Sequence, residues 1–440
     1  MLRSRQIRCI IAFFLILFGF SSLSQAGLIR DAELESELEK LAMPMARSAG
    51  LPSLKIRIVP ETSYNAFVMG RDVIYVHAGL LLKARSGEEI LGVFAHEIGH
   101  LAAGHVPRRS EAIQEANLAT TLSALAAIAA AASGSGDAAV GVLLGGTDQA
   151  KRRYLARSRQ DEAIADEWAL TLLDEHQISA SGMADFMRRL ASERALPESR
   201  QSEYYATHPA AHDRLHVFED HLSQSAYSDS ELPLKSQAVL MRLRGKLAAY
   251  LDRPAPLLRE LRKAEPSDNT RYQLAILHYR RGNFSEALVQ LDALISAHPS
   301  DPFYLELKGD ILMGAAEIEA ARGLYENAYR LSGQHPLIGL SLARCLIAIG
   351  QPDDLEKAAT LLSRLQQSEP NWAFIYRQKA IALGRLGRLA DADILLAEEA
   401  LLIGDKAQAR LLATRARKYE NASEGVKQRA DDILFQLSAQ

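Results

Sequence analysis

The motif His96-Glu97-Ile98-Gly99-His100 combines the side chains that a metal-dependent hydrolase needs. Its two histidines are four residues apart, so on a helix both imidazoles leave the same face one turn apart. Two neutral imidazoles at this spacing can bind one Zn²⁺, and Glu97 can act as the general base toward a water molecule. So short a pattern also occurs by chance, and the rest of the chain must therefore supply a third ligand.

The best candidate for the third ligand is Glu162, which lies in an apolar-periodic stretch that favours a helix. Asp166 follows four residues later and shares its helical face. One of these carboxylates can bind zinc while the other accepts the free N–H of a ligand imidazole. Acidic residues in a first helical turn also complement the helix dipole, which would be the preferred interpretation without the motif at His96.

Two further histidines have weaker cases. His105 follows His100 by five residues, whereas the metzincin pattern needs a histidine six residues after the second one. On a continuous helix it would be rotated by roughly 140° from His100, so we expect a surface histidine or one that supports a ligand from behind. His208 precedes Pro209, which predicts a helix start. There His208 could point into a cleft and Arg214 could neutralise a carboxylate, with a solvated loop histidine as the alternative.

The residues before the motif predict a small cleft wall. Residues 31–48 have the pattern of an amphipathic helix, and residues 54–59 and 73–76 alternate as short strands. An edge strand beside a metal-binding helix could pair with an extended peptide by strand addition. Residues 65–67, with the sequence Asn-Ala-Phe, would lie near this wall, and an ordinary loop is the alternative there.

The first 26 residues predict a cleavable signal peptide. A basic start precedes an apolar run over 10–20, and Ser24-Gln25-Ala26 is typical of a cleavage site. The apolar run is short for a transmembrane helix, and an uncleaved N-terminal anchor is the alternative. The mature chain would keep only Cys345, which we expect to be a small buried hydrophobe, and no internal disulfide. Export without disulfides fits the bacterial periplasm.

Composition bounds the remaining possibilities. The chain has 440 residues, of which 48% are hydrophobic and 24% charged, which suits two or three globular domains rich in helix. The formal net charge of −3 gives no reason to expect a nucleic-acid partner.

Residues 117–146 are rich in alanine and leucine. They predict a buried helical hairpin or, alternatively, a mobile lid or an apolar surface that contacts substrate or a membrane face.

Self-similarity appears from about residue 268 onwards. Successive alanines are separated by 34, 37 and 34 residues, at Ala287, Ala321, Ala358 and Ala392. A period of 34 residues with small residues where helices cross is the signature of tetratricopeptide repeats. Stacked helix pairs of this kind form a concave groove suited to protein ligands. An irregular helical bundle is the alternative.

Taken together, these motifs resemble the M48 family of zinc metallopeptidases over about residues 51–221. The features that carry the resemblance occur in the family's order: Asn-Ala-Phe at 65–67, the His-Glu-x-x-His motif, Glu-x-x-Ala-Asp at 162–166, and His208-Pro209 with Arg214. The resemblance implies that His96, His100 and Glu162 bind one zinc ion and that Glu97 is the general base. It also implies that His208 either stabilises the tetrahedral oxyanion or occupies the open zinc position at rest.

The resemblance further implies a periplasmic zinc endopeptidase that hydrolyses misfolded or stalled envelope proteins, outer-membrane β-barrel proteins among them. Its repeats would recruit substrates or the β-barrel assembly machinery. The alternative is a chaperone or scaffold whose zinc site is blocked or vestigial. A binding module of that kind would still use the repeats but would cleave nothing.

The predicted fold is mainly α. A zincin-type α+β metalloprotease domain, with a small sheet edge and the metal-binding helix, precedes an α-solenoid of tetratricopeptide repeats. The predicted boundaries are 1–26 for the signal peptide, 27–225 for the protease domain, 226–267 for connecting helices or a degenerate repeat, and 268–440 for the repeat domain.

Overall fold

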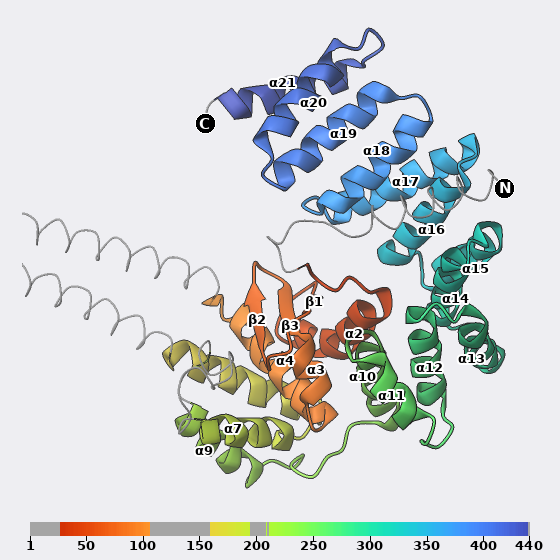
Figure 1. Cartoon of the computed structure of the whole chain (residues 1–440). Helices are drawn as coiled ribbons and strands as arrows, with labels where there is room; N and C mark the ends of the chain where they lie inside the picture. The colour runs from red at the N-terminus through yellow and green to blue at the C-terminus, as the bar shows by residue number, and fades with distance from the viewer. Residues whose placement is uncertain (1–26, 106–158, 194–207, 209–210, 439–440) are drawn as a thin grey trace, which may run out of the picture. The chain divides into compact units, whose positions relative to one another are not determined.

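A computed structural model of the chain describes residues 27–105, 159–193, 208 and 211–438 (Figure 1). The chain divides into two compact units, one of Met1–Ile29 and Met45–Asp229 and one of Arg30–Pro44 and Ser230–Gln440. The predicted signal peptide and the predicted hairpin over 117–146 lie outside the described residues. The predicted fold class is confirmed, because helices dominate both units and a small sheet lies in the first.

The sheet of the first unit has three strands in the order β1-β3-β2, namely β1 (Lys55–Val59), β2 (Ala66–Met69) and β3 (Val73–His77). β1 runs parallel to β3, and β2 runs antiparallel to it. The strands predicted over 54–59 and 73–76 are therefore confirmed. The segment 65–67 enters the sheet as the start of β2 rather than forming an ordinary loop, since its backbone pairs with β3.

The two edges of this sheet differ. Ile29 forms an isolated antiparallel bridge to Ile58, with its N–H 2.8 Å from the carbonyl oxygen of Ile58, so the outer side of β1 is partly covered. Within the described residues β2 pairs with β3 alone. Among the described residues β2 is thus an edge strand, and an edge of this kind can pair with an extended peptide.

Helix α4 (Gly87–Ala102) carries the metal-binding motif and is buried along most of its length (Figure 1). The Ser86 hydroxyl caps its start by accepting a hydrogen bond from the Glu89 N–H at 3.2 Å. The buried Glu89 carboxylate also pairs with Arg189 of α7 (Ser181–Glu193) and accepts a hydrogen bond from Tyr64. These contacts hold the first turn of α4 in place, about two helical turns before His96.

The helical residues 159–175 pack closely against α4 at Gly99. A Cβ at Gly99 would lie only 2.8 Å from the Ala165 carbonyl oxygen and 2.8 Å from Trp168 Cβ. Glycine is therefore required for this close approach. Since Glu162 and Asp166 lie on the same helical segment, the contact brings their carboxylates near the motif histidines. Helices α3 (Ala78–Lys83) and α9 (Ala211–Leu222) complete the described part of this unit.

The second unit is a succession of helices, in which α10 and α11 both pack on α12 and each helix from α12 onwards packs on the next. They are α10 (Leu234–Leu251), α11 (Pro254–Leu261), α12 (Asp268–Arg280), α13 (Phe284–Ala297), α14 (Pro302–Gly314), α15 (Ile318–Leu331), α16 (Pro336–Ile349), α17 (Pro352–Ser368), α18 (Ala373–Arg385), α19 (Leu389–Leu402), α20 (Lys406–Lys418) and α21 (Glu424–Ser438). The four alanines that define the sequence period are all buried where these helices pack. Cys345 is also buried, as expected, and has a free thiol.

Helix α2 (Ala32–Ser48) confirms the helix predicted over 31–48, but its residues 32–44 belong to the second unit. The buried Lys246 ammonium donates to Asp31 Oδ1 at 2.8 Å and to Glu33 Oε2 at 2.9 Å, and the Tyr272 hydroxyl donates to the same Glu33 oxygen at 2.6 Å. Although burial lowers it, the pKa of Lys246 is raised well above its usual value by Asp31 and Glu33. These ionic contacts explain why residues 30–44 group with the second unit. The predicted domain boundaries stay predictions.

No helix within the described ranges combines the length and the apolar character needed to cross a bilayer.

The close approach at Gly99 leads to a test of the link between packing and the site. We expect Gly99→Ala to lower the free energy of unfolding by about 1–3 kcal/mol, because the added methyl group overpacks the contact with residues 159–175. It should also weaken metal binding, since Glu162 must move with that helix. Chemical denaturation and metal titration of the purified protein measure both effects.

Gly323 of α15 is the matched control, because a Cβ there would meet nothing within 4 Å. Gly323→Ala should raise the free energy of unfolding by about 0.5–1 kcal/mol through the better helix propensity of alanine. Equal effects of the two substitutions would contradict the close-approach argument.

Candidate metal centre

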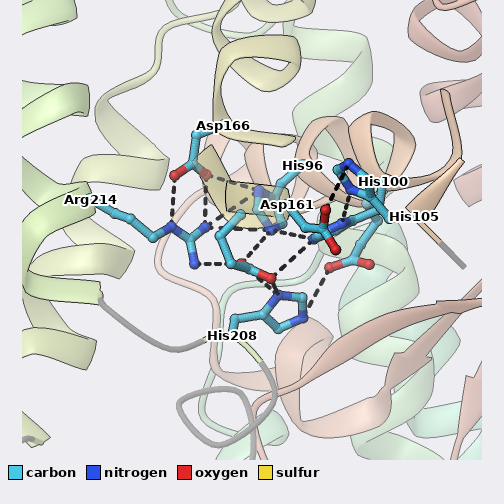
Figure 2. A network of polar contacts seen from close by, with 9 residues as sticks. His96, His100, His105, Asp161, Asp166, His208 and Arg214 are labelled. Carbon is cyan, nitrogen blue, oxygen red and sulfur yellow. Dashed lines mark hydrogen bonds and ion pairs between the residues drawn. The ribbon is translucent and has the colours of Figure 1, made fainter. Parts of the chain in front are cut away.

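Four side chains from three segments converge in the first unit. His96 and His100 come from α4, Glu162 comes from the helical residues 159–175, and His208 lies three positions before Ala211, where α9 begins. Each offers one donor atom, and these atoms all lie within 4.8 Å of one another. All four side chains are buried, and Figure 2 shows the rings of His96, His100 and His208 close together.

The Nε2 atoms of His96 and His100 and the Glu162 carboxylate, taken as one donor group, form a tight triangle. His96 Nε2 and His100 Nε2 are 3.2 Å apart, Glu162 Oε2 is 3.3 Å from His96 Nε2, and Glu162 Oε1 is 3.4 Å from His100 Nε2. Ligands that surround a zinc ion tetrahedrally at about 2.0–2.1 Å lie about 3.3–3.4 Å apart. The two-nitrogen, one-carboxylate donor set and its spacing therefore fit a tetrahedral metal ion with one further position.

Asp166 and Arg214 hold this triangle from behind (Figure 2). His96 Nδ1 lies 2.9 Å from Asp166 Oδ1, so its N–H can donate there while Nε2 faces the centre. The Arg214 guanidinium donates to both Asp166 oxygens, at 2.7 Å each, and to Glu162 Oε2 at 2.8 Å. A bidentate pair of this kind is both strong and directional. Arg214 thus supplies positive charge to two buried carboxylates at once.

The buried charges shift one another's protonation. Burial would raise the pKa of Glu162, but the charges of His208 and Arg214 hold it well below its usual value. Burial would likewise raise the pKa of Asp166, and Arg214 and the hydrogen bond from His96 lower it instead. Both carboxylates are therefore anionic at neutral pH, the state that a metal ligand and an imidazole acceptor require.

The two ligand histidines respond differently to burial. Burial and Arg214 lower the pKa of His96, but hydrogen bonds to Asp166 and Glu162 and the Asp166 charge outweigh them and raise it to about 9. Burial dominates at His100 and lowers its pKa well below the usual value. In the metal-free site His96 thus holds a proton at neutral pH while His100 does not.

Glu97 and His208 lie together beside the triangle. Glu97 is fully buried, and its Oε1 lies 3.5 Å from His208 Nε2. His208 Nδ1 lies 2.9 Å from Glu162 Oε2 and 3.1 Å from Glu162 Oε1. His208 therefore contacts the predicted metal ligand Glu162 through Nδ1 and the predicted base Glu97 through Nε2. Pro209, the other residue of that dipeptide, lies outside the described residues.

The structure brings all seven sequence-predicted site residues together, namely His96, Glu97, His100, Glu162, Asp166, His208 and Arg214. His105 also contacts the cluster, with its Nδ1 2.8 Å from His100 Nδ1 (Figure 2). The rotation of 140° assumed a continuous helix, whereas α4 ends at Ala102 and Gly104 adopts a left-handed φ of 66°. The expectation of a surface position was wrong, and that of support from behind a ligand fits this contact.

Asp161 is the residue that the sequence interpretation missed. Its Oδ1 lies 3.5 Å from His105 Nε2, and only 6% of its surface is exposed. Its position immediately before Glu162 was the available signal, but adjacent residues on a helix point about 100° apart. Its direction toward His105 could not be deduced without the turn at Gly104.

Comparisons with known proteins agree with this geometry. Residues 29–221 match the family model of Peptidase family M48. This part of the chain is an M48 peptidase domain, as the sequence motifs predicted, and the protein is a metallopeptidase.

Over most of its length the chain is similar to the beta-barrel assembly-enhancing protease of Escherichia coli (strain K12). The two are 26% identical over 349 residues, which is 77% of this chain and 69% of the relative. The putative beta-barrel assembly-enhancing protease of Vibrio cholerae is 26% identical over 375 residues, 82% of this chain and 75% of its own. Metalloprotease LoiP of Escherichia coli (strain K12) is 28% identical over 200 residues, 44% of this chain and 72% of its own.

The raised pKa of His96 makes metal binding depend on pH. A metal ion needs the neutral imidazole, so below about pH 9 it must displace a proton from His96. We expect the affinity of the metal-free protein for Zn²⁺ to fall by about tenfold for each pH unit from 9 down to 7. Competition with a chelator at several pH values measures it.

Asp166→Asn should weaken this dependence, because it removes the carboxylate that raises the His96 pKa. A zinc affinity of the wild-type protein that stays constant between pH 7 and pH 9 would contradict the prediction.

Proposed function

We propose that this metallopeptidase is a periplasmic zinc endopeptidase that hydrolyses misfolded or stalled envelope proteins, outer-membrane β-barrel proteins among them. The observation that carries the proposal is the triangle of His96, His100 and Glu162 donor atoms, 3.2–3.4 Å apart, beside the buried Glu97. Three protein ligands with an open fourth position are typical of catalytic rather than structural zinc.

The residues of this chain have separate tasks in the proposed reaction. A bound zinc ion supplies Lewis-acid activation of water and of the peptide carbonyl. His96, His100 and Glu162 hold it, and Asp166 keeps His96 in the tautomer that leaves Nε2 unprotonated. The Glu97 carboxylate takes a proton from the attacking water and delivers it to the leaving amine nitrogen.

Two roles are proposed for His208, whose Nε2 lies 3.5 Å from Glu97 Oε1. An N–H at this position can donate to the oxyanion of the tetrahedral intermediate. Its inclusion in the four-atom donor cluster instead favours a resting state in which His208 occupies the fourth position. This second arrangement supports the alternative function of a chaperone or scaffold with a blocked site.

The open edge of the sheet supports a polypeptide substrate. β2 pairs with β3 on one side only within the described residues, and the sheet packs against α4. An extended peptide could add to β2 as a further antiparallel strand, which holds a scissile bond by main-chain hydrogen bonds independent of sequence. Such binding suits unfolded proteins of varied sequence.

The compartment and the partners rest on the predicted signal peptide and on the relatives. Two of the relatives are named for enhancing β-barrel assembly. We propose the same class of envelope substrate here, with the repeats of the second unit recruiting substrates or assembly machinery through their stacked helix pairs. A peripheral membrane contact through residues 117–146 stays a prediction.

Replacement of Glu97 by glutamine tests the proposed chemistry. Glu97→Gln should abolish cleavage of an unfolded outer-membrane β-barrel protein while the protein keeps one zinc ion per chain, because the amide cannot accept the proton. Gel analysis of the substrate and metal analysis of the protein measure the two properties. Cleavage at the wild-type rate would show that the base is another residue.

His208→Arg separates the two proposed functions. If His208 blocks the site at rest, the substitution should raise cleavage of the same substrate, whereas loss of an oxyanion donor should lower it. If neither wild type nor His208→Arg cleaves any unfolded β-barrel protein tested while the repeats still bind partners, the endopeptidase proposal is wrong. The protein then acts as a chaperone or scaffold.

A further inference from the structure

A chain of polar contacts leads from His100 away from the metal centre. His105 Nδ1 lies 2.8 Å from His100 Nδ1, and on its other side His105 Nε2 lies 3.5 Å from Asp161 Oδ1. His105 is 1% exposed and Asp161 is 6% exposed, so this pair is held inside the protein. Buried polar groups require partners, and here the partner of the pair is a ligand histidine.

The turn after α4 makes this contact possible. The helix ends at Ala102, and Gly104 follows with a left-handed φ of 66°. Glycine adopts this conformation without the steric cost that a side chain would bring. The chain therefore leaves the helical path, and the His105 ring reaches back to the Nδ1 side of His100.

The metal centre determines which nitrogens carry protons along this chain. His100 Nε2 belongs to the donor triangle, so it must present a lone pair to a metal ion and the single proton must sit on Nδ1. That proton can be donated to His105 Nδ1 only if His105 carries its own proton on Nε2. The opposite arrangement, with His105 donating, would put the His100 proton on Nε2 and block metal binding.

Asp161 favours the productive arrangement. Its carboxylate lies on the Nε2 side of His105, and a nearby anion favours the tautomer with a proton at that nitrogen. In this arrangement the His105 proton is on Nε2, facing Asp161, and the His100 proton is on Nδ1, facing His105 Nδ1. The other ligand histidine, His96, contacts a carboxylate without an intervening imidazole, because its Nδ1 lies 2.9 Å from Asp166 Oδ1.

We infer that His105 and Asp161 are positioning residues that fix the tautomer and orientation of the metal ligand His100. This inference rests on the proposed function, since it assumes that His100 binds zinc. The helical residues 159–175 then serve both histidines, with Glu162 as the ligand, Asp166 behind His96, and Asp161 behind His100 through an intervening imidazole.

The test measures the zinc affinity of the full-length mature protein by competition with a chelator, without an activity assay. His105→Phe keeps a ring of similar size but removes the acceptor, and we expect it to bind zinc about 10–100-fold more weakly. Asp161→Asn is close to isosteric and should weaken binding by about tenfold. His105→Asn, whose amide oxygen can stand where Nδ1 was, should recover most of the loss caused by phenylalanine.

A double substitution distinguishes a connected chain from two independent structural effects. His105→Phe with Asp161→Asn should bind zinc no more weakly than His105→Phe alone, because Asp161 acts through His105. The visible absorption bands of the Co²⁺-loaded protein should shift in His105→Phe, since the orientation of a coordinating imidazole changes. His298→Phe and Asp268→Asn are the matched controls, because that exposed pair lies 2.7 Å apart in the second unit and should leave zinc affinity unchanged.

The outcomes separate the inference from the proposed function. If wild type binds zinc and Glu97→Gln behaves as predicted, but His105→Phe and Asp161→Asn bind zinc within twofold of wild type, the positioning role is wrong and the function stands. The positioning role would also be wrong if the fold-losses of zinc affinity in the two single variants multiplied in the double variant. A wild-type protein that binds no zinc overturns both. If His105→Phe fails to fold, Asp161→Asn and His105→Asn decide the question.

Discussion

The buried guanidinium of Arg214 is the interaction on which the metal centre depends. Glu162 and Asp166 are both removed from water, and a buried carboxylate is costly unless it is paired and hydrogen-bonded. Arg214 contacts both, so each stays anionic with its oxygens directed to a histidine or to the centre. Removing one partner of a buried ion pair leaves an uncompensated charge. The cluster therefore constrains its members as a group.

The same helix contact serves the core and the chemistry. The motif histidines lie on α4, while the carboxylates lie on residues 159–175, and the two helical segments meet where Gly99 has no side chain. Close packing tolerates little change in separation. The distance between the histidines and Glu162 is consequently set by this packing together with the ionic contacts of Arg214.

The second unit is stabilised mainly by contacts between neighbouring helices. Its cores are formed between neighbouring helices, with small residues such as Ala287 and Ala321 at the crossings. This is how a repeat array builds stability from nearest-neighbour contacts. The exception is the ionic contact of Lys246 with Asp31 and Glu33, which joins residues more than 200 positions apart in the chain. The second unit thus includes residues 30–44, which lie within the range 29–221 that matches the M48 family model.

Local periodicity in the sequence determined many of the helices and strands of this protein. The spacing of His96 and His100 places both on one helical face whatever surrounds them, and the 34-residue period predicts stacked helix pairs, because both are properties of short stretches of chain. The strands at 54–59 and 73–76 followed from alternation for the same reason. Glu162, Asp166, His208 and Arg214 could be proposed from residue type and order, although their mutual distances could not.

The tertiary structure alone decided the rest. Residues 66–67 became part of a strand because β3 pairs with them, and residues 30–44 joined the second unit because Lys246 contacts Asp31 and Glu33. His105 turned back to His100 because the backbone reverses at Gly104, a change of direction that no helical period contains. The sequence by itself determined which groups could bind a metal ion. Only the tertiary structure decided which nitrogens and oxygens face one another, because those distances depend on contacts between segments remote in the chain.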